Sequence, residues 1–288
     1  MIVAVPTPER HGVGIAFAAT GVFLFICADA AIKHFSADYH AVMVAWFSGV
    51  FGAVSSTGLG ARGLGLDTLR TRQPLAQVLR GLLITGSMVT AFLALKFMPL
   101  ADVSAVGYST PLFVAALAVP LLGERLTRHQ GLAVAIGFAG VLLIAQPGTG
   151  VFRPAALLAM TSAFLYAIAM IVTRRMRASE TAAATMLWSH ATVAVVTSVA
   201  LPWFWSTPTT LDGLLLVVLG LVNGTAHYCV MQAYRVAPAS RVAPFDYTGL
   251  VWATVFGYVL WGDYPAPAVW LGVALVVSMT LYLARIRA

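Results

Sequence analysis

Residues 94–135 read ALKFMPLADVSAVGYSTPLFVAALAVPLLGERLTRHQGLAVA, and residues 233–274 read AYRVAPASRVAPFDYTGLVWATVFGYVLWGDYPAPAVWLGVA. Aligned without a gap, the two stretches match at Pro99 and Pro238, at Tyr108 and Tyr247, and at Gly123-Glu124 and Gly262-Asp263. Alanine, valine and leucine often match by chance in so apolar a chain, so these other matches carry the evidence. The pattern predicts two halves built on one plan.

The composition is that of a membrane protein. Of the 288 residues, 60% are hydrophobic and only 9% are charged, whereas an ordinary soluble domain carries about 25% charged residues. The apolar runs at residues 13–27 and 192–203 are continuous, unlike the alternating strands of a membrane β-barrel. We therefore predict an all-α polytopic membrane protein.

Ten membrane-spanning helices are predicted. A spanning helix needs roughly 20 apolar residues, and we cut the chain at charge clusters, glycines and prolines. The resulting segments are residues 12–33, 40–60, 75–96, 101–122, 129–146, 154–173, 182–204, 211–234, 239–261 and 266–285. The first five form one predicted repeat at residues 12–146, and the last five form a second at residues 154–285.

The basic residues predict the orientation. With the N-terminus in the cytoplasm, all of them except Lys33, Lys96 and Arg153 fall on the cytoplasmic side, as the positive-inside rule requires. The C-terminus is then cytoplasmic too, and the net charge of +7 reflects topology rather than nucleic-acid binding. An odd number of helices per repeat inverts the second one, and inverted repeats are typical of transporters whose substrate site lies between the halves.

Two predicted helices contain prolines beside their shared tyrosines. Pro111 lies within residues 101–122 and Pro244 within residues 239–261. A proline removes a backbone donor and clashes with the carbonyl four residues earlier. We expect hinges at Gly107, Pro111 and Pro244, although membrane helices also contain prolines where there is no cavity.

The polar residues near these prolines are the candidate substrate contacts. The pairs Tyr108-Ser109 and Tyr247-Thr248 offer aromatic faces and hydroxyls that suit an amphipathic organic solute. Asp246 is an ionisable group within a predicted span, which marks it as a functional candidate. It could receive a substrate ammonium or exchange a proton. The structural alternatives are packed tyrosines and an Asp246 that pairs with Arg241 or favours a helix N-terminus.

Other polar pairs have structural explanations of similar weight. Asp29 and Lys33 stand four residues apart, so we expect them to pair on one helix face at the outer mouth. His227 could line a cavity or make a hydrogen-bonded helix contact. Gly220 and Gly224 have the G-x-x-x-G spacing that favours close helix packing.

Motifs for other functions are missing. The sequence has no G-x-x-x-x-G-K-[ST] phosphate-binding loop, so ATP-driven transport by this chain alone is excluded. It also lacks the nucleophile and metal-ligand motifs of common hydrolases. We expect no catalytic residues, no cofactor and no metal site, and a membrane-embedded enzyme is a remote alternative.

Several motifs resemble those of the EamA-type drug/metabolite transporters. They are A-L-x-x-x-P-x-A-x-V at Ala94–Val103, P-L-F at Pro111–Phe113 and G-E-R-L-T at Gly123–Thr127. Within that superfamily the chain looks most like the bacterial exporters of aromatic amino acids. The second half departs from the pattern, because Gly262-Asp263-Tyr264-Pro265 replaces G-E-x-x-T and Leu250 stands where a proline is expected.

The resemblance implies a multi-pass protein of the bacterial inner membrane. The first, third, fourth, sixth, eighth and ninth helices would surround a central cavity, and the fifth and tenth would support it. The implied substrate-binding residues are Tyr108, Ser109, Tyr166, His227, Asp246, Tyr247 and Thr248.

The expected function is amino-acid export by alternating access. The substrates would be aromatic amino acids, with methionine or threonine as further candidates, and the protein is expected to be a monomer in the lipid bilayer. Export of a nucleobase, S-adenosylmethionine or a drug-like amphiphile stays open, as does proton coupling. No nucleic-acid partner is expected.

Overall fold

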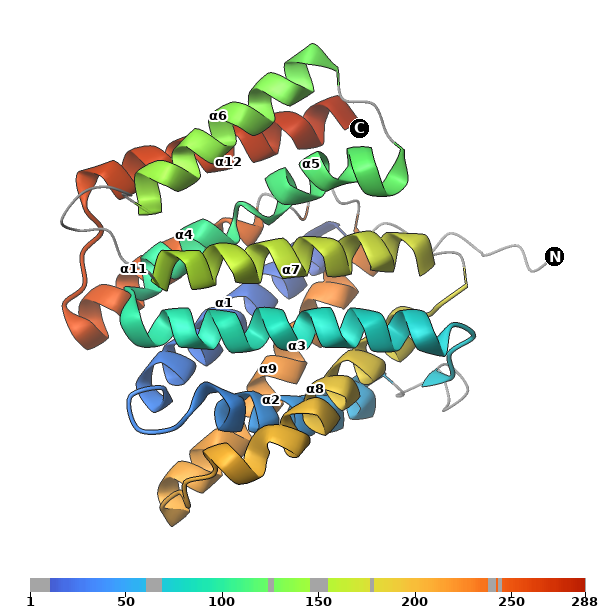
Figure 1. Ribbon diagram of the computed structural model, residues 1–288, viewed down its shortest axis with the longest axis vertical. Coiled ribbons are helices and arrows are strands. Elements are labelled where there is room, and N and C mark those ends of the chain that lie inside the picture. Colours follow the sequence, from blue (N-terminus) through green and yellow to red (C-terminus); the bar gives the residue numbers. More distant parts are fainter. Residues whose placement is uncertain are drawn as a thin grey trace.

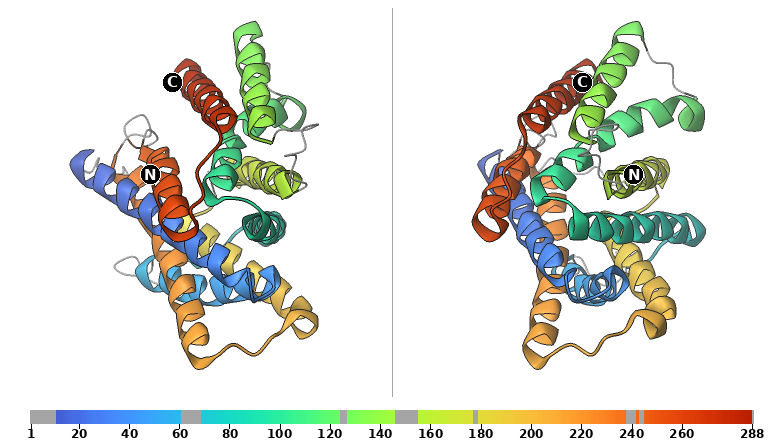
Figure 2. Two further views of the ribbon diagram at one scale, coloured as in Figure 1. Left: turned by 90° about the vertical axis from the view of Figure 1, so that its left-hand side faces the viewer. Right: turned by 60° about the vertical axis from the view of Figure 1, so that its left-hand side comes forward.

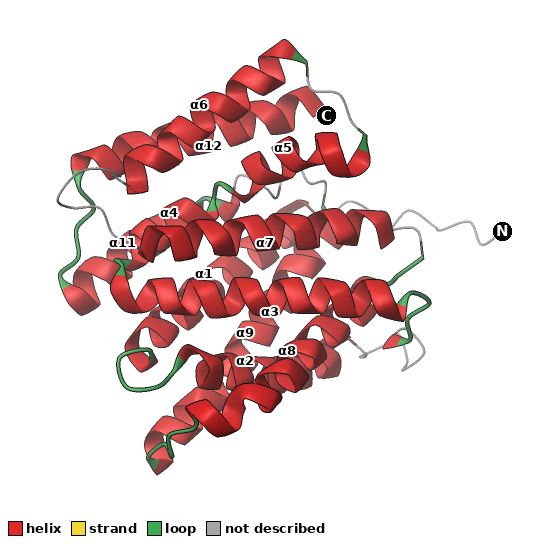
Figure 3. Ribbon diagram, viewed as in Figure 1, coloured by secondary structure: helices red, strands yellow, loops and turns green. Residues whose placement is uncertain are grey.

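The computed structural model describes residues 11–60, 69–123, 127–145, 155–176, 179–237, 242 and 245–287. This described part consists of helices and loops without strands (Figure 3). The helices are α1 (His11–Phe35), α2 (Ala41–Gly60), α3 (Pro74–Phe97), α4 (Leu100–Gly107), α5 (Thr110–Leu122), α6 (Arg128–Ala145), α7 (Ala155–Met176), α8 (Ala182–Phe204), α9 (Thr210–Val236), α11 (Thr248–Trp261) and α12 (Pro267–Arg287).

The helices have the length and composition of membrane spans. Seven described segments are long and apolar enough to cross a membrane, and one of them, Leu100–Leu122, includes both α4 and α5. Three shorter apolar helices lie at residues 128–144, 248–261 and 267–283. An all-helical, multi-pass membrane protein is therefore confirmed. The count of ten spans and the cytoplasmic position of both termini stay predictions.

The two halves of the chain interleave. Helix α1 packs against α9, α2 against α8 and α9, and α3 against α7 and α8 (Figure 1). At one edge of the molecule α6 packs against α12, away from α8 and the start of α9 (Figure 2). Each of these contacts joins a helix from residues 12–146 to one from residues 154–285, so the two halves pack against each other along most of their helices.

Glycines allow the closest helix crossings. A Cβ atom on Gly140 of α6 would lie 2.7 Å from the Gly272 carbonyl oxygen of α12, so these backbones touch. A Cβ atom on Gly220 of α9 would lie 2.5 Å from the Phe47 carbonyl oxygen of α2, and Gly224 sits equally close to Gly52. Small residues permit such approach in membranes, where packing rather than hydrophobic burial drives helix association. The packing predicted for Gly220 and Gly224 is confirmed.

The central helix of the first half is interrupted at Gly107, four residues before Pro111. Helix α4 ends at Gly107 and α5 begins at Thr110, whose Oγ1 donates a hydrogen bond of 2.8 Å to the Gly107 carbonyl oxygen. Pro111 therefore lies in the first turn of α5, where a missing N–H leaves no helical bond unmade. The break at Tyr108 and Ser109 corrects the expectation of a kink within a continuous helix.

The second half has an interruption at the equivalent place. Residues 245–246 are helical, Tyr247 forms a turn and α11 begins at Thr248. The predicted hinge Pro244 lies outside the described residues, and so do other residues used in the sequence predictions: Glu124, Arg153, Pro238 and Arg241.

Candidate functional site

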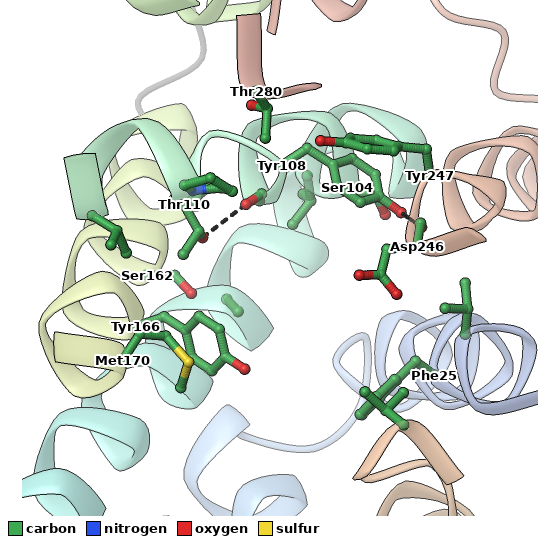
Figure 4. A pocket seen from close by; sticks show the side chains of 18 of the residues that line it. Phe25, Ser104, Tyr108, Thr110, Ser162, Tyr166, Met170, Asp246, Tyr247 and Thr280 are labelled. Atoms are coloured by element: carbon green, nitrogen blue, oxygen red, sulfur yellow. Dashed lines mark hydrogen bonds between the residues drawn. The ribbon is translucent and has the colours of Figure 1, made fainter. Parts of the chain in front are cut away.

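A cavity of about 720 Å³ lies at the centre of the helices (Figure 4). This size is within the usual range of about 300–1,000 Å³ for small-molecule sites. Its walls come from α1, α3, α4, α5, α7, α9 and α12 and from the two residues that precede α11. Residues from both halves of the chain therefore face one space.

Two tyrosines form one wall of this cavity. The Tyr108 and Tyr247 rings lie 5.3 Å apart between centroids, with a tilt of 40°. The Tyr108 hydroxyl donates a hydrogen bond of 2.7 Å to the backbone carbonyl oxygen of Asp246. Glycine at position 249 leaves room for this hydroxyl, because a Cβ atom there would lie 2.5 Å from the Tyr108 hydroxyl oxygen. The predicted pair of tyrosines is brought together, and both line the cavity.

Asp246 presents its carboxylate to the cavity beside these tyrosines (Figure 4). One carboxylate oxygen accepts a hydrogen bond of 2.8 Å from the Tyr234 hydroxyl of α9. This bond holds the side chain in one orientation. The alternative pairing with Arg241 falls on a residue outside the described part of the chain.

The opposite wall is a stripe on α7. Ser162, Tyr166 and Met170 are spaced four residues apart, so they share one helix face. The Tyr166 hydroxyl points into the cavity (Figure 4). Ser162 shares a hydrogen bond of 3.0 Å with Ser87 of α3, which joins the two helices behind the wall.

Asp29 differs from its sequence prediction. The Lys33 ammonium pairs with Asp263, at 2.8 Å, and donates to the Met98 carbonyl oxygen at 2.9 Å. The same ammonium lies 5.0 Å from the centre of the Trp261 ring. Lys33 thus joins α1 to the α11–α12 connection and to the turn before α4, and the predicted Asp29–Lys33 pair is wrong. Asp29 instead lines the cavity.

Three other predicted contacts do not line the cavity. The Ser109 hydroxyl donates to the Val106 carbonyl oxygen at 2.6 Å, and the Thr248 hydroxyl donates to the Phe245 carbonyl oxygen at 2.7 Å. Both hydroxyls are therefore engaged with the backbone at the breaks. The His227 ring packs edge-on against Phe25 and His190, at centroid distances of 4.6 and 5.2 Å: it lies behind the wall formed by Phe25.

The predicted hinges Gly107 and Pro111 do line the cavity, as does Tyr166. Sequence reasoning missed Ser104, Thr110 and Thr280, which also line it. Isolated hydroxyls in apolar helices usually bond to their own backbone, so no sequence signal singles these out. Thr280 comes from α12, so the helix that was expected to support the cavity also lines it.

The charged side chains of the cavity wall have one sign. Among the described residues that line it, Asp29 and Asp246 are acidic and none is lysine, arginine or histidine. The described residues also contain no group of three histidine, cysteine, aspartate or glutamate side chains arranged for a metal ion.

Comparison with known proteins places the chain among transporters. The model of the EamA-like transporter family matches residues 12–146 and 153–284. A protein named S-adenosylmethionine uptake transporter from Rickettsia bellii is 24% identical over 275 residues, which cover 96% of this chain and 94% of that protein. A riboflavin transporter from Rhizobium johnstonii is 30% identical over 223 residues, covering 77% and 74% of the two chains.

An exporter and a solved structure complete the comparison. The pseudopaline exporter CntI from Pseudomonas aeruginosa is 27% identical over 279 residues, covering 95% of this chain and 96% of that protein. One solved protein structure superimposes with a TM-score of 0.64 at 21% identity, covering 94% and 96% of the two chains. These matches support the family, and a specific likeness to aromatic amino acid exporters is not shown.

Proposed function

Because this chain belongs to the EamA-like transporter family, we propose that it is a secondary transporter that moves a small amine-bearing metabolite by alternating access. The central cavity carries the proposal. Both halves of the chain line it, and it contains one carboxylate oriented by Tyr234 and several tyrosine side chains. Such a lining suits an organic solute with a charged nitrogen and an apolar or aromatic body.

The helix packing supports the two inverted repeats proposed at residues 12–146 and 154–285. Under this proposal α1 is equivalent to α7, and α3 is equivalent to α9. Exchange of the halves converts the α1–α9 contact into an α7–α3 contact, and both contacts are present. The α2–α8 and α6–α12 contacts convert into themselves, and they are present too. A symmetric pairing of this kind lets one half rock against the other.

Amino acids are the first candidate substrates. The ammonium would contact Asp246, and an aromatic or thioether side chain would pack on the faces of Tyr108 and Tyr247. We propose export of such amino acids from the cytoplasm across a bacterial inner membrane by a monomer. Hydroxyls and helix-end amides would have to receive the substrate carboxylate.

S-adenosylmethionine is the second candidate, for a specific reason. The two charged residues in the described cavity wall are acidic, and this molecule carries a sulfonium as well as an ammonium group. The Rickettsia relative bears its name. The same protein could therefore carry a cation rather than a zwitterion.

Counterflow in proteoliposomes tests the proposed function. Vesicles containing purified protein are loaded with unlabelled phenylalanine, methionine or S-adenosylmethionine, and entry of the same radiolabelled compound is measured. Transient accumulation above that in protein-free vesicles is expected for at least one compound. The absence of accumulation for all three, with the protein correctly inserted, would contradict the proposal for these candidates. A reporter fused to either terminus tests the predicted cytoplasmic orientation.

A further inference from the structure

Asp29 is a carboxylate that the described structure leaves without a hydrogen-bonding or ionic partner. Its expected partner Lys33 is held by Asp263, by the Met98 carbonyl oxygen and by the Trp261 ring. Asp29 remains in the cavity wall. An ionised carboxylate in an apolar protein interior carries a large desolvation cost unless a positive charge offsets it. A bound cation from outside the chain would therefore stabilise the ionised Asp29 side chain.

Asp29 lies on the side of the cavity next to the tyrosine wall. It shares one face of α1 with Val22, Phe25 and Ile26, at the spacing of successive helical turns. A Cβ atom on Gly249 would meet the Tyr108 hydroxyl at 2.5 Å and also Val22 at 3.0 Å and Ile26 at 3.5 Å. This face of α1 therefore adjoins Tyr108, whose hydroxyl is bonded to the Asp246 backbone.

Two basic side chains of the described helices α1 and α3 are engaged elsewhere. The Lys33 ammonium of α1 forms an ion pair with Asp263. Arg80 of α3 donates to the Thr173 hydroxyl at 2.6 Å and also to the Ser189 hydroxyl, and it does not line the cavity. Among the described residues of the wall, no cationic side chain is present to pair with a substrate carboxylate. Two carboxylates, Asp29 and Asp246, are present to pair with a substrate cation.

We propose that the transported substrate is an organic cation with a net positive charge, held jointly by Asp29 of α1 and Asp246 before α11. Its flat or apolar part stacks on Tyr108 and Tyr247, since a cation bound beside carboxylates also gains from tyrosine faces. This inference rests on the proposed transport function and chooses between its two candidates. It favours S-adenosylmethionine and other ammonium, guanidinium or sulfonium compounds with a net positive charge over the zwitterionic amino acids and over anions.

Ligands that share a phenyl group on a short chain but differ in charge separate the effect of charge from that of shape. The set is phenylalaninamide (cation), phenylalanine (zwitterion), 3-phenylpropanamide (neutral) and 3-phenylpropionate (anion), measured by equilibrium dialysis against the purified full chain. The measurement is made at about pH 7, where free carboxylates are ionised and most α-amino groups are protonated. Phenethylamine, whose amine stays protonated there, is included as a second cation. We expect the cations to bind at least tenfold more tightly than the zwitterion, about 1.4 kcal/mol.

Isosteric variants then assign the charge to residues. Asp29→Asn and Asp246→Asn should each weaken phenethylamine binding about tenfold while leaving 3-phenylpropanamide binding unchanged. Asp38→Asn, which neutralises an exposed carboxylate in the α1–α2 loop, should leave both unchanged. A variant that fails to fold is recognised by its elution profile, and the wild-type ligand series still tests the charge preference.

The outcomes distinguish the preference for a cationic substrate from the proposed transport function on which it rests. Equal or tighter binding of the zwitterion or anion would overturn the inference, and so would an unchanged cation preference in Asp29→Asn. If counterflow of any solute persists in either case, the proposed transport function stands. Flux that depends on a pH gradient but not on substrate charge would assign Asp29 to proton exchange and would also overturn the inference.

Discussion

The breaks in the two central helices are alike in backbone and unlike in side chains. Tyr108 adopts φ −66° and ψ −6°, and Tyr247 adopts φ −72° and ψ −12°. In each half the next residue, Ser109 or Thr248, donates its hydroxyl to the carbonyl oxygen three residues earlier. Both helices then end at a left-handed glycine, Gly123 or Gly262. The interruption is thus specified by the same local chemistry twice.

The side chains around the breaks differ. The residue before the shared tyrosine is Gly107 in one half and Asp246 in the other, and the residue two positions after it is Thr110 or Gly249. The first half therefore supplies the Tyr108 hydroxyl, and the second supplies the acceptor carbonyl and the space for it. A nearly symmetric backbone carries an asymmetric site, because a single substrate does not need the same contact on both sides.

The largest expected effect on transport comes from replacing a residue at the second break with its equivalent from the first. Gly249→Thr copies Thr110, and its side chain would overlap the Tyr108 hydroxyl and press against Val22. Overpacking of this kind typically costs about 1–3 kcal/mol. We expect counterflow to fall at least tenfold while the protein still inserts.

The reciprocal change is the matched comparison. Thr110→Gly removes the hydrogen bond to the Gly107 carbonyl oxygen and creates no clash. A loss of about 1 kcal/mol in the free energy of unfolding is expected. Equal damage to transport from both variants would show that the two breaks contribute in the same way, against the asymmetry described above.

The ends of the molecule offer a second comparison. Lys33 at the end of α1 makes an ion pair in which its side chain is 12% exposed and that of Asp263 is 30% exposed. Arg175, at the equivalent end of α7, donates to the Leu121 carbonyl oxygen and is exposed. Lys33→Met should therefore lower the free energy of unfolding by about 1–2 kcal/mol, less than a fully buried pair costs.

Arg175→Met is the matched control for Lys33→Met. It should cost less than about 1 kcal/mol, because an exposed contact is screened by solvent. Both values come from denaturant titration in detergent micelles. A larger loss for Arg175→Met would mean that the α5–α7 end, rather than the α1–α11 end, is the more firmly held.

Tyr234 and its equivalent in the first repeat, Leu95, differ in their contact with the Asp246 carboxylate. Both side chains line the cavity, but only Tyr234 bonds to Asp246. Tyr234→Phe should weaken amine binding several-fold, about 1 kcal/mol, because the bond is partly solvent-exposed. Leu95→Phe keeps an apolar wall and serves as the size control in the same dialysis assay. A Tyr234→Phe variant with wild-type affinity would remove the orienting role given to this hydroxyl.

The smallest effect concerns the N-termini of the equivalent helices α3 and α9. Helix α9 is capped by its own Thr209, whose hydroxyl accepts from the Asp212 N–H at 3.1 Å. Helix α3 has no cap of its own. Instead, Glu180 from the α7–α8 connection accepts from the backbone N–H groups of Arg72 and Gln73, at 2.8 and 3.1 Å.

The Glu180 cap makes stability depend on pH. Partial burial opposes ionisation, but hydrogen bonds from Thr71, Gln77 and the two backbone groups outweigh it and hold the pKa of Glu180 below its ordinary value. Its contribution is therefore full above the unfolded pKa and is lost as pH falls through the folded pKa. Glu180→Gln should cost at most about 1 kcal/mol at neutral pH, and the difference should vanish in acid. A difference independent of pH would exclude the ionised cap.

Some of this organisation was predictable from local sequence. The segment 182–204 was expected as a helix, and α8 has the same bounds because charge and proline clusters punctuate it. Tyr108 and Tyr247 were found because the repeat aligned them, and Asp246 was found because it is an ionisable residue within a predicted span. Pro111 was misleading, because a proline fits the first turn of a helix as well as a kink, and only the Thr110 bond to Gly107 shows where the helix stops.

The sequence by itself determined the all-helical membrane architecture, the two related stretches and the tyrosines that they share. These follow from hydropathy, turn residues and residue identity, which are properties of neighbouring positions. The tertiary structure decided that Lys33 serves Asp263, that Asp29 faces the cavity and that Ser109, Thr248 and His227 do not. Such choices depend on which side chains from distant helices meet, and a partner 230 residues away along the chain leaves no local signal.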